Sequence, residues 1–432
     1  MIREVKTLPR IPRGFRDFPP PVMILRKEVL SKIEEIYKRF GFDPLETPVL
    51  EYWETVRGKL GEEAETKLMF VFPDFLSKEW YTLRYELTFP LARFVAMHPE
   101  LPLPFKRYHI GRVWRHEEPQ RGRYREFWQC DADVVGSPYP EADAEIIELN
   151  VEVFRAFNFQ DFVVRLNDRR LLTGIFEEEL GIRNPVPVYR TIDKLDKIGE
   201  DGVRAELLAK GMHEGVVNRI MEIISVKGSP KEVLEEASKI KNEKVSSGVD
   251  HLSQIVDMVE GPIQVDLSLV RGLEYYTGPV FETVVKEPKI GSIAGGGRYD
   301  KLIALYSDRD VPATGVSIGV ERLIDAGLEL GIFSLEKKSY VQVYVISMKR
   351  ESWPYALKVA RKLRRDGVYV AVDLMRRNFR SQKEHAKKLG AKVLAFVGPK
   401  EVEGEKVTLY REDGTRVEVP LSELTSKVKE LL

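Results

Sequence analysis

The stretch LVRGLEYYTGPVFE (Leu269–Glu282), with AGGGRYDKL following at Ala294–Leu302, is the most informative part of this chain. Before it, hydrophobic and polar residues alternate over 263–269, which is the period-two pattern of a half-buried strand. After it, residues 279–285 are rich in β-branched and aromatic side chains, which also favours a strand. We therefore predict two strands that flank the stretch and form a β-hairpin.

Three side chains of this stretch, Arg271, Tyr275 and Tyr276, are predicted to lie on or beside a rigid sheet. The neighbouring glycines relax the backbone enough for a small ligand to approach. An ordinary tight turn with two packing tyrosines explains the same letters, so other parts of the chain must decide between the two interpretations.

The composition is typical of a soluble globular protein. The chain has 432 residues, of which 43% are hydrophobic and 31% charged, and this length accommodates two or three domains. Its single cysteine, Cys130, excludes a disulfide framework and a cysteine zinc site. We find no run of eighteen apolar residues and no signal-like N-terminus, so we expect a cytoplasmic protein that does not contact a membrane.

The formal net charge of zero conceals an asymmetry. Residues 338–432 contain 21 Lys and Arg against 12 Asp and Glu, a net charge of +9 that the rest of the chain balances with −9. A basic segment suggests a polyanionic partner, although a solvated helix surface has the same composition.

Periodicity divides the chain into three parts. Residues 25–40 have a hydrophobic helical stripe that ends at Gly41; strand-like segments follow at 66–88 and 105–135, then an amphipathic helix at 141–157. Residues 167–261 are helical and charge-rich, and we interpret them as an inserted helical subdomain because the strand pattern resumes at Ile263. From 338, strands at 341–348, 368–372 and 393–397 alternate with helices at 353–365 and 381–389, which predicts a small α/β domain with parallel strands.

The segment TLRYELTFP (Thr82–Pro90) is predicted to be a strand. Arg84, Glu86 and Thr88 then share one face, and the carboxylate and hydroxyl of the last two suit a primary ammonium group. Taken alone, this segment is better explained as an exposed polar sheet face.

Residues 112–136 are predicted to form two strands joined by a loop that contains Pro119 and Gly122. On the second strand, Gln129, Asp131 and Asp133 form the polar face. Arginines crowd the loop and its edges, and such a cluster favours a bound anion such as phosphate over a merely charged hairpin: Arg112, Arg115, Arg121, Arg123 and Arg125.

In GVSIGVERLIDAG (Gly315–Gly327) a strand turns into an amphipathic helix with Arg322 in its first turns. A cation there opposes the helix dipole, so a phosphate ligand explains it better than a structural role, although a salt bridge to the sheet remains an alternative. The chain has no phosphate-binding GxxxxGK[ST] loop, no HExxH and no GxSxG motif.

Together these residues resemble the class II aminoacyl-tRNA synthetases, and specifically the histidyl-tRNA synthetase family. FGFDPLETPVLE (Phe40–Glu51) is similar to the first class II motif, which builds the dimer interface around a proline, here Pro48. WRHEEPQRGRYREF (114–127) is similar to the second motif and GVSIGVERL to the third. RGLxYY and AGGGRYD resemble the two histidine-specific signatures.

The resemblance implies an α+β fold: a class II antiparallel sheet flanked by helices, with a helical insertion and a C-terminal α/β anticodon-binding domain. The implied domains are a catalytic core at 1–167 and 261–332, an insertion at 168–260 and an anticodon-binding domain at 338–432.

The resemblance also assigns roles to residues. Arg271, Arg115 and Arg322 are implied to be catalytic; Arg115, Glu117, Arg123 and Arg322 to bind ATP; and Glu86, Thr88, Gln129, Asp133, Arg271, Tyr275, Tyr276 and Tyr299 to bind histidine. Two residues depart from the usual patterns. Asp133 replaces the glutamate of the bacterial version, so QCDAD resembles the archaeal and eukaryotic version, and Glu86 stands where that second version usually has aspartate.

The implied activity is that of a histidine–tRNA ligase, which activates L-histidine with ATP and transfers it to tRNA(His). ATP is then a substrate, Mg²⁺ is expected with it, and a homodimer is expected. Two alternatives differ in class: a non-catalytic paralogue such as a regulatory subunit of histidine biosynthesis, and a class II synthetase for threonine, proline or glycine. The intact arginines argue against the first, and the paired histidine signatures against the second.

Overall fold

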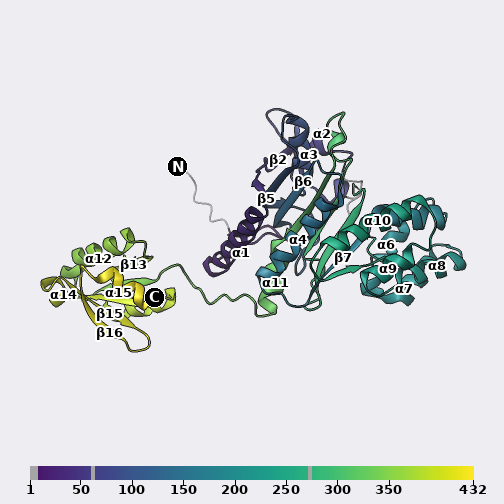
Figure 1. Cartoon of the computed structure of the whole chain (residues 1–432). Coiled ribbons are helices and arrows are strands. Elements are labelled where there is room, and N and C mark those ends of the chain that lie inside the picture. Colours follow the sequence, from purple (N-terminus) through teal and green to yellow (C-terminus); the bar gives the residue numbers. More distant parts are fainter. Residues whose placement is uncertain (1–7, 60–63, 271–274) are drawn as a thin grey trace. The chain divides into compact units, whose positions relative to one another are not determined.

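The structure is a computed structural model that describes residues 8–59, 64–270 and 275–432. The chain folds as two compact units. One unit comprises Val29–Phe333 together with residues 8–17, and the other comprises Ser334–Leu432 together with Phe18–Glu28. Figure 1 shows the elements of both units along the chain.

An eight-stranded, largely antiparallel sheet organises the first unit. Only its two outermost pairs are parallel, β1 with β5 and β7 with β8. The strands run across the sheet in this order: β1 (Asp43–Pro44), β5 (Phe105–Trp114), β6 (Glu126–Val135), β11 (Ala313–Gly319), β10 (Ala294–Arg298), β9 (Pro279–Val285), β7 (Phe162–Asp168) and β8 (Ile263–Val265). The expected class II antiparallel sheet is confirmed.

Two long helices, α1 (Pro20–Arg39) and α4 (Pro140–Ala156), cover one face of this sheet (Figure 1). The Tyr37 hydroxyl of α1 donates to the carbonyl oxygen of Cys130 at 2.9 Å, and Asn150 of α4 donates to the Thr283 hydroxyl at 2.6 Å. The helices bury the apolar side of β6, which leaves the opposite, polar side for a ligand. A third helix, α11 (Val320–Glu329), continues from β11.

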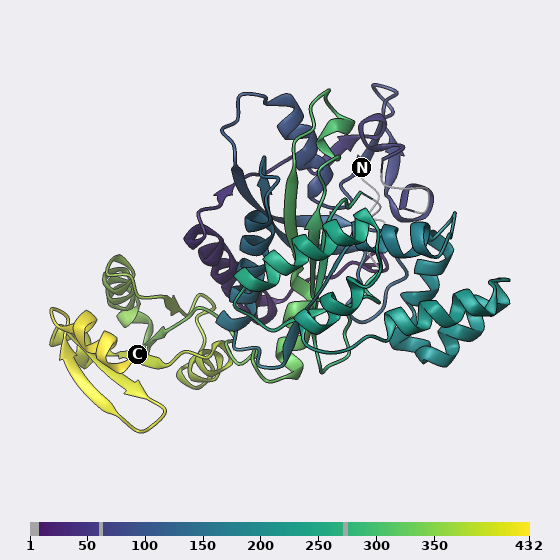
Figure 2. The ribbon, with the colours of Figure 1, turned by 45° about the vertical axis from the view of Figure 1, so that its right-hand side comes forward.

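The inserted segment between β7 and β8 is helical. It packs beside the β7–β8 edge of the sheet, where the teal helices gather in Figure 2. Its elements are α5 (Arg169–Thr173), the π-helical turn η2 (Gly174–Glu179), α6 (Val186–Ile192), α7 (Leu195–Ala209), α8 (Glu214–Ile224), α9 (Pro230–Ala237) and α10 (Glu243–Met258).

The predicted hairpin around the opening stretch is wrong. β8 pairs in parallel with β7, and β9 pairs with the other edge of β7, so a third strand separates the two flanks. β8 also ends at Val265, earlier than the alternation over 263–269 suggested. Alternation reports the faces of a strand but carries no information about its partner.

The prediction of a single strand over Thr82–Pro90 is also wrong. Strand β4 (Trp80–Leu83) ends before Arg84, and helix α3 (Thr88–Met97) begins at Thr88. β4 belongs to a small antiparallel sheet in the order β2–β4–β3, with β2 (Leu50–Tyr52) and β3 (Val71–Pro73). The short turns α2 (Trp53–Val56), η1 (Ala64–Leu68) and η3 (Ile303–Leu305) complete this unit.

A five-stranded sheet organises the second unit, in the order β13–β12–β14–β15–β16. The predicted parallel pairs are present, since β12 pairs in parallel with both β13 and β14, but the antiparallel strands β15 and β16 were not anticipated. The strands are β12 (Val343–Ser347), β13 (Val370–Val372), β14 (Val393–Val397), β15 (Lys406–Arg411) and β16 (Arg416–Pro420). The helices are η4 (Arg350–Ser352), α12 (Trp353–Arg365), α13 (Phe379–Leu389), α14 (Pro399–Glu403) and α15 (Leu424–Leu431).

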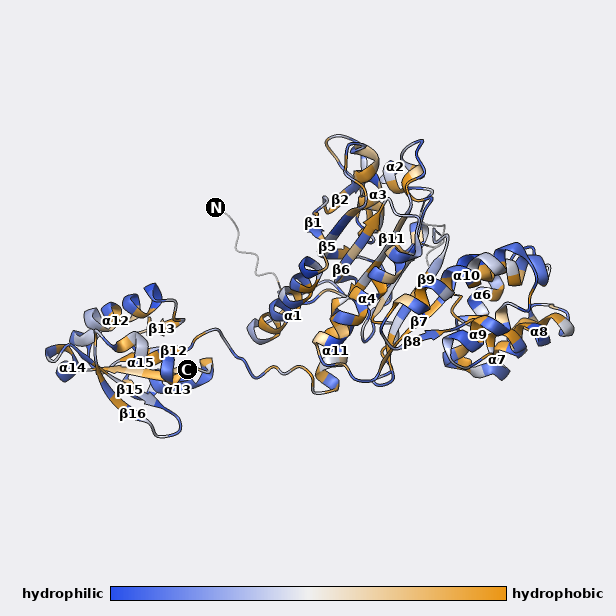
Figure 3. Cartoon of the chain, viewed as in Figure 1, coloured by the Kyte–Doolittle hydropathy of each residue, from blue (hydrophilic) through white to orange (hydrophobic). Residues whose placement is uncertain are grey.

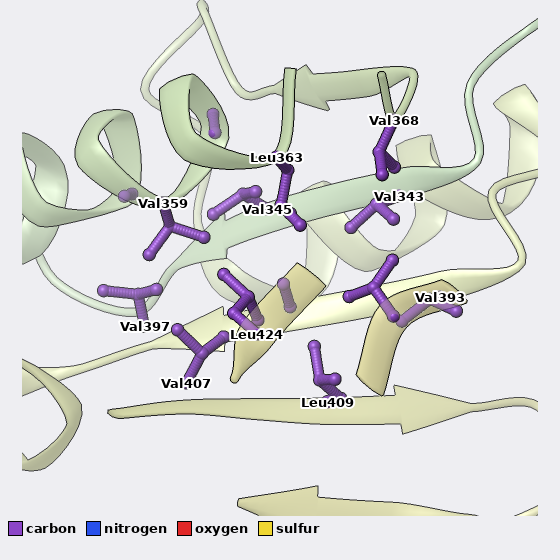
Figure 4. Packing of buried hydrophobic residues seen from close by; sticks show 14 of the residues in the cluster. Val343, Val345, Val359, Leu363, Val368, Val393, Val397, Val407, Leu409 and Leu424 are labelled. Atoms are coloured by element: carbon purple, nitrogen blue, oxygen red, sulfur yellow. The ribbon is translucent and has the colours of Figure 1, made fainter. Parts of the chain in front are cut away.

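The core of the second unit is apolar. Val345, Leu363 and Leu409 are fully buried and pack together with other valines and leucines, as Figure 4 shows. Figure 3 shows the hydrophobic residues concentrated on strands and on the inner sides of helices in each unit. Within the described ranges, no helix combines the length and the apolarity that crossing a membrane requires.

Candidate active site

A cavity of about 370 Å³ lies against the polar face of the eight-stranded sheet. Gln129, Asp131 and Asp133 of β6 line it, since alternate residues of a strand share a face. Ser317 of β11 pairs with Asp131 in the strand register and lines it too. The sheet therefore forms a rigid polar floor for the cavity.

Every predicted site residue that the structure describes lines this cavity. They come from the segment that leads into α3, the loop between β5 and β6, β6 itself, the segment before β9, the residue after β10, and α11: Glu86, Thr88, Arg115, Glu117, Arg123, Gln129, Asp133, Tyr275, Tyr276, Tyr299 and Arg322. Arg271 lies outside the described residues.

Glu86 is tied to the helix that follows it. One of its carboxylate oxygens accepts from the backbone N–H of Thr88 at 2.5 Å and the other from that of Phe89 at 2.8 Å. The carboxylate thus caps the N-terminus of α3, where helix N–H groups need acceptors. Burial raises the pKa of Glu86, while these hydrogen bonds and the nearby Arg115 oppose that shift.

Asp133 has two partners inside the protein. Tyr299 donates its hydroxyl to Oδ1, and the Arg107 guanidinium lies 2.8 Å from Oδ2. Arg107 is fully buried and also donates to the Leu87 carbonyl oxygen at 3.0 Å. Burial raises the pKa of Asp133, and the charge of Arg107 lowers it.

Two glycines make room for these side chains. A Cβ added at Gly315 would lie 2.0 Å from Asp133 Oδ1, and one added at Gly297 would lie 2.9 Å from the Tyr276 ring. Both positions exclude every larger residue as long as the neighbouring side chains stay in place. This explains why the glycine-rich strand β10 and the strand β11 form the wall beside Asp133 and Tyr276.

The tyrosine pair belongs to an aromatic wall of the cavity. The Tyr275 ring packs edge-on against Phe89 at 5.5 Å and Tyr299 at 5.8 Å between centroids, and it lies 5.0 Å from the Tyr276 ring. Burial raises the pKa of Tyr276 well above its ordinary value, as do the nearby carboxylates Asp133 and Asp131. Tyr276 therefore remains a neutral hydroxyl that can donate and accept.

Two arginines, Arg115 and Arg322, line the cavity. The Arg115 guanidinium lies 4.4 Å from the Tyr85 ring centroid and 5.2 Å from that of Phe127, and its Nε donates to the Tyr85 carbonyl oxygen at 3.2 Å. These contacts hold the guanidinium plane in place.

Arg322 is held by backbone as well. Its Nε donates to the Gly122 carbonyl oxygen at 3.0 Å, and its Nη1 to the carbonyl oxygen of Ser292. The prediction that Arg322 has no structural role is therefore incomplete, because Arg322 joins the loop tip to α11. In the same loop, Arg123 lies 3.7 Å from Glu117.

Two residues of the cavity floor, Asp131 and Ser317, and the arginine that pairs with Asp133, Arg107, were not assigned from the sequence. Arg107 left no signal, because a buried arginine inside a strand looks like any polar strand residue. Asp131 and Ser317 did leave one, since alternation places Asp131 on the same face as Gln129 and Asp133.

The described part of the chain contains no group of three or more His, Cys, Asp or Glu side chains arranged to hold a metal ion.

This combination of a helix-backed antiparallel sheet with a polar cavity, an arginine on the strand–loop–strand segment and an arginine on the following helix defines the catalytic domain of a class II aminoacyl-tRNA synthetase. The sequence model of histidyl-tRNA synthetase matches residues 14–323, and that of an anticodon-binding domain matches residues 342–431. The chain belongs to the histidyl-tRNA synthetase family.

Similar proteins span the whole chain. The histidine–tRNA ligase of Korarchaeum cryptofilum is 67% identical over 98% of this chain and 99% of its own length. That of Aeropyrum pernix is 59% identical over 98% of both. The crystal structure of histidyl-tRNA synthetase from Nostoc sp. PCC 7120 superposes with a TM-score of 0.86 at 31% identity, covering 99% of this chain and all of that one.

The fold alone does not separate the enzyme from its paralogues. A solved ATP phosphoribosyltransferase regulatory subunit/histidyl-tRNA synthetase from Bacillus halodurans C has a TM-score of 0.75 at 24% identity, over 90% of this chain and 98% of that one. The far higher identity to the two ligases, with both arginines in the cavity, favours the enzyme. The family match argues against a synthetase for threonine, proline or glycine.

Proposed function

We propose that this chain is a histidine–tRNA ligase, which activates L-histidine with ATP and then transfers it to the 3′-terminal adenosine of tRNA(His). The observation that carries the proposal is the meeting of two oriented arginines, buried carboxylates and a neutral tyrosine in one cavity. Arginines suit phosphate oxygens, and the carboxylates and hydroxyl suit an amino acid with a polar ring.

In the first step, a carboxylate oxygen of histidine attacks the α-phosphorus of ATP. The new C–O–P bond forms as the bond from the α-phosphorus to the bridging oxygen breaks, and pyrophosphate leaves with that oxygen. Arg115 and Arg322 contact the phosphates and stabilise the charge that develops there. Glu117 and Arg123 complete the ATP site, and Arg271 supplies positive charge at the histidine carboxylate.

Histidine is held along the floor and the aromatic wall. Glu86, Thr88 and Gln129 receive the α-ammonium group, while Asp133 and Tyr276 bind the imidazole and Tyr275 and Tyr299 close the pocket. A rigid floor favours catalysis because positioning supplies much of the rate in such a transfer.

Mg²⁺ enters with ATP in this proposal. Mg²⁺ is commonly held by substrate phosphate oxygens and water together with one or two carboxylates. When bound, it neutralises phosphate charge.

Residues 338–432 bind the anticodon region of the tRNA in this proposal. Their net charge of +9 supplies the salt-dependent part of the affinity. Residues 1–167 with 261–332 form the catalytic core, and 168–260 form an insertion domain. We also propose a cytoplasmic homodimer whose interface includes Phe40–Glu51.

Pyrophosphate exchange into ATP, measured with each of the twenty amino acids, tests the proposal. We expect exchange with histidine alone, followed by charging of tRNA(His) when tRNA is added. No exchange with any amino acid would instead indicate a non-catalytic regulatory paralogue.

A further inference from the structure

Two neighbouring acceptors on the cavity floor lack donors. Gln129 and Asp131 are 8% and 2% exposed, and both line the cavity from the same face of β6. Among the residues that the structure describes, nothing donates a hydrogen bond to Gln129 Oε1 or to Asp131 Oδ1. Buried acceptors without a donor are costly, so such a pair on a cavity wall points to a ligand that donates to both.

Ser317 fixes the orientation of this pair. The Gln129 side-chain nitrogen donates to Ser317 Oγ at 2.7 Å, and Ser317 also hydrogen-bonds Asp131. Because a serine hydroxyl has one proton and that proton goes to the carboxylate, its oxygen must accept from Gln129. The amide oxygen of Gln129 is therefore the atom left for a ligand, beside one oxygen of Asp131.

Two neighbouring carboxylates of the cavity, Glu86 and Asp133, already have partners within the protein. Both oxygens of Glu86 accept from backbone N–H groups of α3, and Asp133 has the Tyr299 hydroxyl and the Arg107 guanidinium as partners. Of these three carboxylates, Asp131 is the one with an oxygen, Oδ1, that has neither a hydrogen bond nor an ion pair with a described residue.

The local charge favours a cation. Glu86 and Asp133 both raise the pKa of Asp131, and burial raises it most, to about 8, whereas Arg107 lowers it. Like charges that approach one another in a buried site favour binding of a positive group between them. A primary ammonium group offers three N–H donors and one positive charge, which matches two acceptors of which one is a carboxylate.

We propose that Asp131, together with Gln129, binds the α-ammonium group of the amino-acid substrate. The assignment rests on the proposed function, and it adds Asp131, which ionises as the ammonium group binds, as the charged acceptor of a site in which Glu86 mainly holds the start of α3. Asp133 keeps its role at the imidazole.

Two histidine analogues separate the ammonium group from the ring. L-Histidinol has the ammonium group and the imidazole, whereas 3-(imidazol-4-yl)propionate has the imidazole without the ammonium group. We expect Asp131→Asn to weaken binding of L-histidinol to the full chain at least about tenfold, measured by calorimetry, because a charge-assisted hydrogen bond is lost. Binding of the propionate should change less than about twofold, since asparagine keeps the shape of the side chain.

The matched control is Asp133→Asn, two residues away on the same face of β6. It should weaken both analogues, because both contain the imidazole. In pyrophosphate exchange, Asp131→Asn should raise KM for histidine more than it lowers kcat, which a purely structural role would not produce.

Three outcomes would overturn the assignment. Equal losses for both analogues in Asp131→Asn would place Asp131 at the ring or in a structural role, and no loss for either would remove it from the site. If the wild-type protein binds neither analogue and supports no exchange with histidine, the proposed function itself fails.

Discussion

The floor of the cavity and the core of the second unit are both buried in a sheet, but opposite chemistry fills them. In the five-stranded sheet, Val345 and Leu409 are fully buried among other aliphatic side chains. In the eight-stranded sheet, Arg107, Asp131 and Asp133 are buried at 0%, 2% and 2% exposure on the face opposite α1 and α4. Aliphatic burial stabilises the folded state, whereas burial of charge costs free energy unless the charges are paired.

The difference indicates what each region is built for. The second unit needs only a stable scaffold beneath its basic surface, so its interior follows the ordinary rule for protein cores. The cavity floor keeps charges in place before a ligand arrives, which lowers its stability and prepares it for catalysis. Substitutions in the two regions should therefore separate activity from stability.

The largest expected effect concerns Arg115, which lines the cavity between two aromatic rings. Arg115→Ala should lower kcat for pyrophosphate exchange by about 10²–10³-fold, because it removes charge that stabilises the transition state. Stability against urea should change little. Arg112→Ala, three residues earlier on β5, is the control, since that side chain is 47% exposed and its guanidinium lies 3.9 Å from Glu126 in a surface ion pair. If both variants lose the same activity, the loss does not come from removing the Arg115 charge at the cavity.

The next effect concerns the aliphatic core, where Leu409 is fully buried on β15 (Figure 4). Leu409→Ala should lower the local free energy of unfolding by about 2–4 kcal/mol, because a buried side chain is replaced by a cavity. Hydrogen exchange of β12, β14 and β15 in the full chain measures this.

Because Leu409 lies outside the cavity, pyrophosphate exchange should stay near normal in Leu409→Ala. Charging of tRNA should fall, because the substitution destabilises the unit proposed to bind the anticodon. Leu374→Ala, at a side chain that is 80% exposed, is the control and should alter neither. Loss of pyrophosphate exchange in Leu409→Ala would mean that the two units are not energetically separate.

The smallest expected effect is a gain in stability rather than a loss. Burial raises the pKa of Asp131 from 3.8 to about 8, so the folded protein holds an extra proton between these values and its stability falls as pH rises through that window. Asp131→Asn removes this cost and should raise the free energy of unfolding by about 1–3 kcal/mol at pH 7. Urea denaturation at pH 7 and at pH 3.5 measures it, with the gain expected to vanish at the lower pH.

The contrasting control is Asp413, an exposed carboxylate of the second unit. Hydrogen bonds, chiefly from the Thr415 backbone N–H, lower its pKa. Its contribution to stability is therefore present at neutral pH and lost in acid, so Asp413→Asn should not stabilise the protein at pH 7. A loss of stability in Asp131→Asn would show that its charge is paired and would weaken the contrast between the two regions.

Much of the fold was predictable because local patterns matched the tertiary environment. The helix at 353–365 and the strand at 393–397 were predicted with the bounds that the structure has, since apolar periodicity and a following glycine mark such elements clearly. Thr82–Pro90 failed because its alternation is equally compatible with a strand and with a strand end that leads into a capped helix. The opening hairpin failed because strand pairing depends on residues far away in the chain, here β7.

The candidate site was likewise predictable in part. The arginine-rich loop, the glycine strand and the polar face of β6 were visible as patterns of residue type, and they identified which side chains belong together. The roles of Asp131 and Arg107 were not visible, because they depend on which atoms already have partners.

By itself, the sequence determined the family, the three parallel strands of the second unit with the two helices between them, and many of the residues that line the cavity, because these follow from residue type and spacing. Only the tertiary structure decided that β7 separates the two flanks of the opening stretch and that Glu86 caps α3. It also decided that Asp131, unlike the neighbouring Glu86 and Asp133, keeps an oxygen without a described partner. Hydrogen-bond partners across a sheet come from segments far apart in the chain, so no local pattern specifies them.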